Sequence, residues 1–222
     1  MARAAGSKGS AKGRARDPAL DILETALDIA EAEGWYKIRL RVVADRLGIP
    51  MTDVLTHYKD LDAVANAWFR RGWDAMLQPP PNGFDDLPAR DRLELVIMRW
   101  FDALAPHRRV TGQMLSAKLW YAPPPHWVPA IFDLSRTLQW NRQAARLDAT
   151  GVQRQMEEVG LTGLFLATLR VWLRDGSENQ EETRAFLKRR LALADRTMAV
   201  VLARRGRRRN GTAKPEEPTP TT

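Results

Sequence analysis

Residues 38 to 62 constrain the fold of this chain more than any other stretch, because two short helical patterns meet there at a glycine. The first pattern repeats apolar residues at the i, i+3, i+4 and i+7 spacing of an amphipathic helix, at Leu40, Val43, Ala44 and Leu47. Gly48 tolerates the left-handed conformation that ends a helix, and Pro50 suits the first turn of a new one. Two short helices joined in this way form a helix-turn-helix, whose second helix can lie in a major groove.

The second helix of this motif is expected from Thr52 to about Tyr58, with Val54, Leu55 and Tyr58 facing inward. The exposed side of the two helices would supply DNA contacts, since Arg and Lys neutralise phosphate while Thr and His donate single hydrogen bonds. The candidates are Arg39, Arg41, Thr52, Thr56, His57, Tyr58 and Lys59. Asp53 is better read as a solvated side chain than as a partner of cytosine. For His57 with Tyr58, a packing pair at a helix end is the alternative.

The run from Arg39 to Ile49, followed by Thr56 to Val64, resembles the N-terminal signature of TetR-type transcriptional regulators. The resemblance covers residues 20 to 75 and includes Trp35. It implies an all-α fold, in which a three-helix head is joined by a long helix to a body with an effector cavity. It also implies a homodimer made by the last two helices and sequence-specific DNA binding controlled by a small hydrophobic effector.

Breaks in the helical pattern divide the chain into four segments. Asp17 with Pro18 is a good helix start, and the run from Pro79 to Gly83 ends the connecting helix. The first segment is too poor in apolar residues to order itself. We expect a disordered basic arm over 1–16, a helix-turn-helix head with connecting helix over 17–77, a helical ligand-binding and dimerisation body over 84–204, and a disordered tail over 205–222.

The net charge of +8 belongs to the two ends of the chain. Residues 1–16 carry +5 and residues 204–222 carry +4, so the rest is close to neutral. The head over residues 17–73 holds seven basic and ten acidic residues and is therefore net negative, which disfavours strong generic duplex binding. Basic ends bind nucleic acid and anionic lipid by the same physics, so charge leaves both partners open.

The body is rich in large apolar side chains suited to a hydrophobic ligand. The ligand-binding candidates are Trp100, Met114, Trp120, Trp127, Phe132, Trp140, Phe165 and Trp172. For each of them, ordinary core packing is the competing interpretation. The helix expected over 151–174 also carries Gly151, Gly160 and Gly163, small residues that let a partner backbone approach. We therefore expect dimer contact there, with core packing again as the alternative.

A second resemblance lies between Leu164 and Arg190, a stretch similar to the C-terminal part of the coenzyme Q biosynthesis accessory family. The matching features are Trp172-Leu173, the Asp175-Gly176-Ser177 turn and Phe186-Leu187-x-x-Arg190. That family has a TetR-like fold, a head that has lost DNA binding and a body that holds isoprenoid lipid. It implies an alternative function in peripheral membrane or lipid contact. The head departs from the usual TetR residues at Thr52, Leu55 and Leu61.

Enzyme chemistry is not expected. The imidazoles of His57, His107 and His126 lie on three unrelated segments, and no Gly-rich phosphate loop or other catalytic motif is present. Cysteine is absent, which excludes disulfides and thiolate metal sites and fits a reducing compartment. We expect no cofactor and no membrane span, and a cytoplasmic protein.

Overall fold

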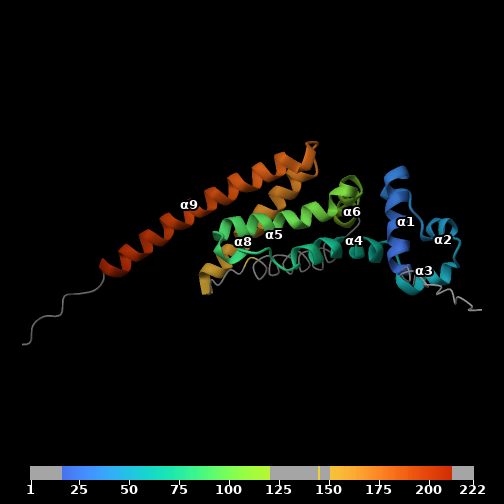
Figure 1. Cartoon of the computed structure of the whole chain (residues 1–222), viewed down its shortest axis with the longest axis horizontal. Coiled ribbons are helices and arrows are strands. Elements are labelled where there is room, and N and C mark those ends of the chain that lie inside the picture. The colour runs from blue at the N-terminus through green and yellow to red at the C-terminus, as the bar shows by residue number, and fades with distance from the viewer. Residues whose placement is uncertain (1–16, 121–144, 146–150, 212–222) are drawn as a thin grey trace, which may run out of the picture. The chain divides into compact units, whose positions relative to one another are not determined.

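The computed structural model of this chain describes residues 17–120, 145 and 151–211 (Figure 1). Their regular structure is helical throughout, which confirms the all-α prediction for the described part. The basic arm and residues 212–222 of the predicted tail lie outside it, whereas residues 205–211 are helical and not the disordered tail expected there. The candidates Trp127, Phe132 and Trp140, and the side chain of Trp120, also lie outside the described part. No described helix is both long and apolar enough to cross a bilayer.

The chain forms two compact units that divide between Trp68 and Phe69. This division falls within α4 (Leu61–Met76), whereas the sequence had suggested a boundary at the proline-rich break that follows that helix. The first unit contains α1 (Pro18–Glu33), the short helix η1 (Trp35–Lys37), α2 (Leu40–Leu47) and α3 (Met51–His57). Helix α1 begins as expected, because the carboxylate of Asp17 accepts a hydrogen bond from the Ala19 amide at 3.0 Å.

The turn between α2 and α3 has the geometry that its residues require. Gly48 adopts the left-handed conformation, with φ 66° and ψ 30°, and its amide bonds back to the end of α2. Pro50 caps α3 with φ −60°. On α3, Val54 and Tyr58 are buried as predicted, whereas Leu55 is 46% exposed, so its predicted inward orientation was wrong. Spacing alone did not decide this, because Val54 and Leu55 lie four and three residues before Tyr58 and either can share its face. The packing of α3 buries the side of Val54 and leaves Leu55 toward solvent.

The second unit is a bundle of longer helices (Figure 1). It contains the end of α4, then η2 (Phe84–Asp86), α5 (Ala89–Leu104), η3 (Ala105–His107), α6 (Arg108–Trp120), α8 (Gly151–Trp172), η5 (Glu178–Gln180) and α9 (Glu181–Gly211). Helices α8 and α9 pack side by side, and α9 also packs against α5. The helix expected over 151–174 is confirmed as α8, and the body expected over 84–204 is helical in its described part, with α9 continuing past the expected end to Gly211.

Within this unit, α4 and α5 approach so closely that only glycine fits at one position. A Cβ built at Gly72 would lie 2.6 Å from both Cδ1 and Nε1 of Trp100. Those atoms belong to a ring that is 4% exposed, so the ring cannot easily move aside. Gly72 is therefore required for the packing of α4 against α5.

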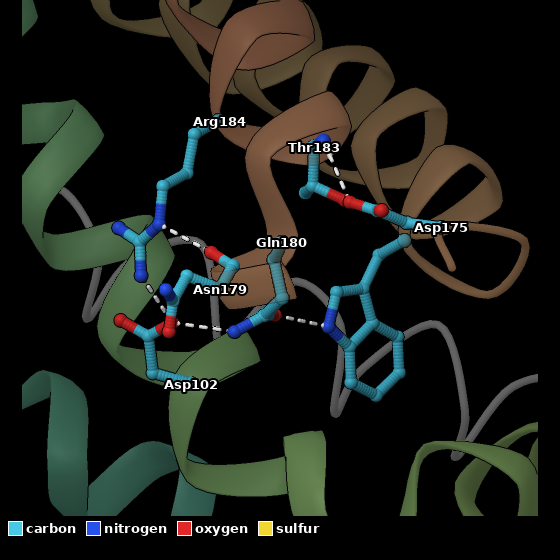
Figure 2. A network of polar contacts seen from close by, with 7 residues as sticks. Asp102, Asp175, Asn179, Gln180, Thr183 and Arg184 are labelled. Carbon is cyan, nitrogen blue, oxygen red and sulfur yellow. Dashed lines mark hydrogen bonds and ion pairs between the residues drawn. The ribbon is translucent and has the colours of Figure 1, made fainter. Parts of the chain in front are cut away.

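The corner between α8 and α9 is built on a buried carboxylate (Figure 2). Asp175 Oδ1 accepts from the amide of Ser177 at 2.9 Å and from its hydroxyl at 2.5 Å. Asp175 Oδ2 accepts from the amide of Thr183 at 2.8 Å and from its hydroxyl at 2.6 Å. Burial raises the pKa of Asp175, but these four hydrogen bonds outweigh it and lower that pKa to about 2.

A second set of polar contacts ties the start of α9 to the end of α5 (Figure 2). Gln180 Nε2 donates to Asp102 Oδ1 at 2.7 Å, and the Arg184 guanidinium donates to the same oxygen at 2.5 Å. Gln180 Oε1 accepts from Trp172 Nε1 at 2.5 Å. To reach both partners, Gln180 takes φ 61°, and Asn179 before it takes φ 51°, a region that residues other than glycine rarely occupy.

Replacing the Asp175 carboxylate tests the hydrogen bonds that hold the corner between α8 and α9. A pKa lowered from 3.8 to about 2 stabilises the fold by roughly 2 kcal/mol above pH 4. Because the folded pKa is depressed, this stability is lost as pH falls from about 4 to about 2. Asp175→Asn should unfold in less urea than wild type at pH 7, and the gap should close across that window. The exposed Asp28→Asn should stay within about 0.5 kcal/mol of wild type at pH 7. A gap that is unchanged from pH 7 to pH 2 would contradict this assignment.

Adding one methyl group tests the contact between α4 and α5. Gly72→Ala should lower the free energy of unfolding by about 1–3 kcal/mol, because its Cβ overlaps a buried indole. Gly176→Ala is the matched control, since a Cβ there meets nothing within 4 Å. The control should be neutral or more stable by up to about 1 kcal/mol. Equal effects of the two substitutions in urea unfolding would contradict the packing requirement.

Candidate functional site

The side of α3 that faces away from the core is the first candidate surface, called here the α3 outer face and made of Thr52, Leu55, Thr56 and His57. All four side chains are exposed. The helix is held from its opposite side, where Val54 is fully buried and the Tyr58 hydroxyl donates to the Ala19 carbonyl at 3.0 Å. The structure therefore brings the predicted contacts Thr52, Thr56 and His57 together on one surface.

Tyr58 does not share that surface with the other candidates. It is 8% exposed and its hydroxyl is bonded to α1, so the packing alternative accounts for this residue. Its predicted role as a DNA contact is therefore not supported by its position. Periodicity could have separated it from its neighbours, because Val54 and Tyr58 stand one helical turn apart.

The basic candidates surround the α3 outer face and hold few fixed partners. Arg39 donates to the carbonyls of Ile38 at 2.7 Å and Tyr36 at 3.3 Å. Arg41 pairs with Asp45 at 3.0 Å, with the two side chains 76% and 64% exposed. An ion pair this exposed is weak, so Arg41 can exchange it for a phosphate. Lys59 is exposed just beyond the end of α3.

Two features of the α3 outer face oppose a strong DNA contact. Leu55 belongs to it at 46% exposure, and this side chain can offer only apolar contact to a base edge. Asp53 on the same helix is exposed, and the Thr52 hydroxyl lies 3.4 Å from its carboxylate. The surface is therefore accessible but poor in positive charge.

An aromatic cluster, formed by Trp100, Phe101, Phe165 and Trp172, is the second candidate site and lies between α5 and α8. Trp100 meets Phe165 edge to face at 5.3 Å and Trp172 at 6.1 Å between ring centroids. Phe101 stacks on Phe165 at 5.5 Å. Three predicted ligand-binding residues thus meet in one place, and Met114 is buried on α6.

The structure places two polar side chains, Gln180 and Arg108, at the edge of this aromatic cluster, and the sequence did not indicate either of them. Trp172 Nε1 donates to Gln180, and the Arg108 guanidinium lies 5.3 Å over the Trp172 ring. Both partners come from other elements, so no local pattern signals them. Trp100 Nε1 is buried and has no hydrogen-bond partner among the described residues.

The outward side of α8 is the third candidate surface. It presents Val159 at 75% exposure and Leu166 at 46%, with Gly160 and Gly163 between them. A Cβ at either glycine would meet nothing within 4 Å. These four residues are called here the α8 outer face. It is apolar and exposed, and its two glycines leave room for another backbone to approach closely. In the described part of the chain, no group of three or more His, Cys, Asp or Glu residues is placed to hold a metal.

Comparisons with known proteins agree with this architecture. The TetR transcriptional regulator from Nitrosomonas europaea ATCC 19718 is 38% identical and superposes with a TM-score of 0.72 over 81% of this chain and 99% of that one. A TetR transcriptional regulator from Rhodococcus sp. RHA1 shares the fold, with 15% identity and a TM-score of 0.57 over 78% and 93% of the two chains.

The COQ9 family model matches residues 149–197, which include α8, the α8–α9 corner and the first half of α9. No curated protein matches the chain. The match to COQ9 is confined to one part of the body, whereas the Nitrosomonas relative is covered almost completely by this chain. With 38% identity over that length, the chain belongs to the TetR family.

Proposed function

We propose that this chain is a homodimeric transcriptional regulator of the cytoplasm that binds specific DNA and responds to a small hydrophobic ligand. The observation that carries the proposal is the orientation of α3. Val54 and Tyr58 anchor the helix from behind, and Thr52, Thr56 and His57 are exposed together on the opposite side. A short helix fixed from one side and polar on the other can enter a major groove.

The side chains divide into two chemical roles. The hydroxyls of Thr52 and Thr56 and the imidazole of His57 make single hydrogen bonds to base edges. Arg39, Arg41 and Lys59 neutralise phosphates on either side of the groove. Because the head holds more acids than bases, part of the electrostatic affinity comes from the basic arm of residues 1–16, which lies outside the described residues.

The α8 outer face serves as the dimer surface in this proposal. A helix that exposes Val159 and Leu166 leaves apolar area in water, and burial against a second copy removes it. The exposed Gly160 and Gly163 permit close approach of the partner helix. A dimer carries two copies of α3, and a two-fold symmetric operator offers one half-site to each of them.

The aromatic cluster and Met114, which is buried on α6, form part of the ligand site. Their side chains are apolar, which suits a hydrophobic effector. Helix α4 packs against this region through Gly72 and Trp100, so a ligand that shifts α5 also acts on α4. No catalytic step is assigned to the site.

A second candidate function is that of a lipid-binding accessory protein of the COQ9 type. Two observations favour it: the COQ9 family model covers the α8–α9 corner, and Leu55, an apolar residue, is exposed on the α3 outer face. In this alternative the body holds an isoprenoid lipid and the chain acts on a membrane or a partner enzyme without DNA. The aromatic cluster and the dimer surface keep the same roles.

DNA binding is tested with duplexes from the region around the gene that encodes this chain, titrated by fluorescence anisotropy across a salt series. Wild type should bind one duplex specifically, with affinity that falls steeply as salt rises. Lys59→Ala should reduce the slope of log K against log salt by about 1, because one phosphate contact is lost. Lys188→Ala, an exposed lysine on α9, is the control and should leave the slope unchanged.

Absence of specific duplex binding at every salt concentration would reject the proposed function as a transcriptional regulator. Copurification of a prenyl or acyl lipid with the same chain would then support the COQ9-type function.

The dimer surface is tested by placing a charge on it. Leu166→Asp should weaken self-association by about tenfold or more, because a carboxylate would be buried without a partner. Leu20→Asp is a matched control, since Leu20 is exposed to a similar degree on α1. Sedimentation velocity across a concentration series measures both variants. Equal dimer stability of Leu166→Asp and wild type would place the dimer elsewhere.

A further inference from the structure

Trp100 carries a hydrogen-bond donor that the described fold does not use. The residue is 4% exposed, and its Nε1 is buried with no hydrogen-bond partner among the described residues. Native structures leave few buried N–H groups unpaired, since each one lowers stability. The other indole of the aromatic cluster, Trp172, donates to Gln180 Oε1. The two indoles therefore differ: one N–H holds the fold together, and the other is free to bind something else.

Gly72 fixes the plane of the Trp100 ring without blocking this donor. A Cβ at Gly72 would lie 2.6 Å from Cδ1, 2.6 Å from Nε1 and 3.1 Å from Cε2. Such similar distances to three atoms of the five-membered ring place Gly72 over the face of that ring. An atom in line with the N–H bond would instead lie much closer to Nε1 than to Cδ1. The direction in which Nε1 donates is therefore not the one that Gly72 occupies.

The rings that contact Trp100 are apolar. Phe165 meets it edge to face, with centroids 5.3 Å apart, and Phe101 and Trp172 also lie against it. A buried water needs about two to four polar partners. Among the four rings only Trp100 offers an unpaired donor, and the buried Arg108 Nε is a further donor without a partner among the described residues. A hydrocarbon molecule with one acceptor oxygen matches the aromatic cluster, because its chain contacts the rings and its oxygen accepts the Trp100 N–H.

We propose that Trp100 Nε1 is the donor that recognises one acceptor oxygen, a carbonyl or an ether, on an otherwise hydrocarbon ligand of the body. The inference rests on the proposed ligand-binding role of the body. It applies both to the transcriptional regulator and to the COQ9-type lipid-binding protein. It makes Trp100 a specificity determinant: ligands of equal hydrocarbon content are distinguished by the presence of that oxygen.

The test compares two ligands of nearly equal shape on the full chain by isothermal titration calorimetry. One is geranylacetone, an isoprenoid ketone, and the other is the hydrocarbon in which a methylene group replaces the carbonyl oxygen. Wild type should bind the ketone about 2- to 12-fold more tightly than the hydrocarbon, the range expected of one net hydrogen bond. Trp100→Phe should remove this preference.

A second variant separates loss of the donor from loss of packing. Replacing Trp100 with benzothienylalanine keeps the two-ring shape and exchanges the N–H for sulfur. This variant should bind the hydrocarbon within about twofold of wild type and lose the ketone preference, and its thermal midpoint reports whether it folds.

Three results distinguish the possible failures. Loss of the ketone preference in the benzothienylalanine variant, with hydrocarbon binding retained, supports the inference. A ketone preference that survives in this variant overturns it while leaving the ligand-binding function intact. Failure of wild type to bind either molecule overturns the ligand part of the proposed function and this inference with it.

Discussion

The anchoring of α3 is the constraint on which the proposed use of the head depends. Val54 is fully buried, and the Tyr58 hydroxyl bonds to the Ala19 carbonyl at 3.0 Å, so the helix is tied to α1 at its centre and at its end. The left-handed Gly48 sets the angle at which α3 leaves α2. Together these contacts decide which side chains face solvent, and a fixed surface on a short helix is what recognition of a groove requires.

In the body, polar contacts fix the corner between α8 and α9. This corner depends on the Asp175 carboxylate, whose four hydrogen bonds compensate for its burial. Gln180 accepts an unfavourable backbone conformation in order to bridge Trp172 and Asp102. This corner lies within the stretch that matches the COQ9 family model, so the similarity to that family includes the residues that fix α9 against α8 and α5.

Local signals in the sequence predicted the local structure. The Asp17 cap, the Gly48 turn and the break after α4 involve residues next to one another, so composition and spacing are enough to place them. The predicted inward orientation of Leu55 was wrong, because which side of α3 is buried depends on how the helix packs against α1. Gln180 and Arg108 were missed because their partners lie on other helices. Apolar burial of Trp100, Phe165 and Trp172 could be expected from their residue types. That the N–H of Trp100 has no partner among the described residues could not.

The most direct test of the central claim is hydroxyl-radical footprinting of the full chain with and without a duplex from the region around its gene. The radicals oxidise exposed Leu and His side chains, so Leu55 and His57 report on the α3 outer face and the exposed Leu193 on α9 reports on the body. The account predicts that the duplex protects Leu55 and His57 and leaves the oxidation of Leu193 unchanged. Equal oxidation of Leu55 and His57 with and without a bound duplex would show that DNA does not meet this face.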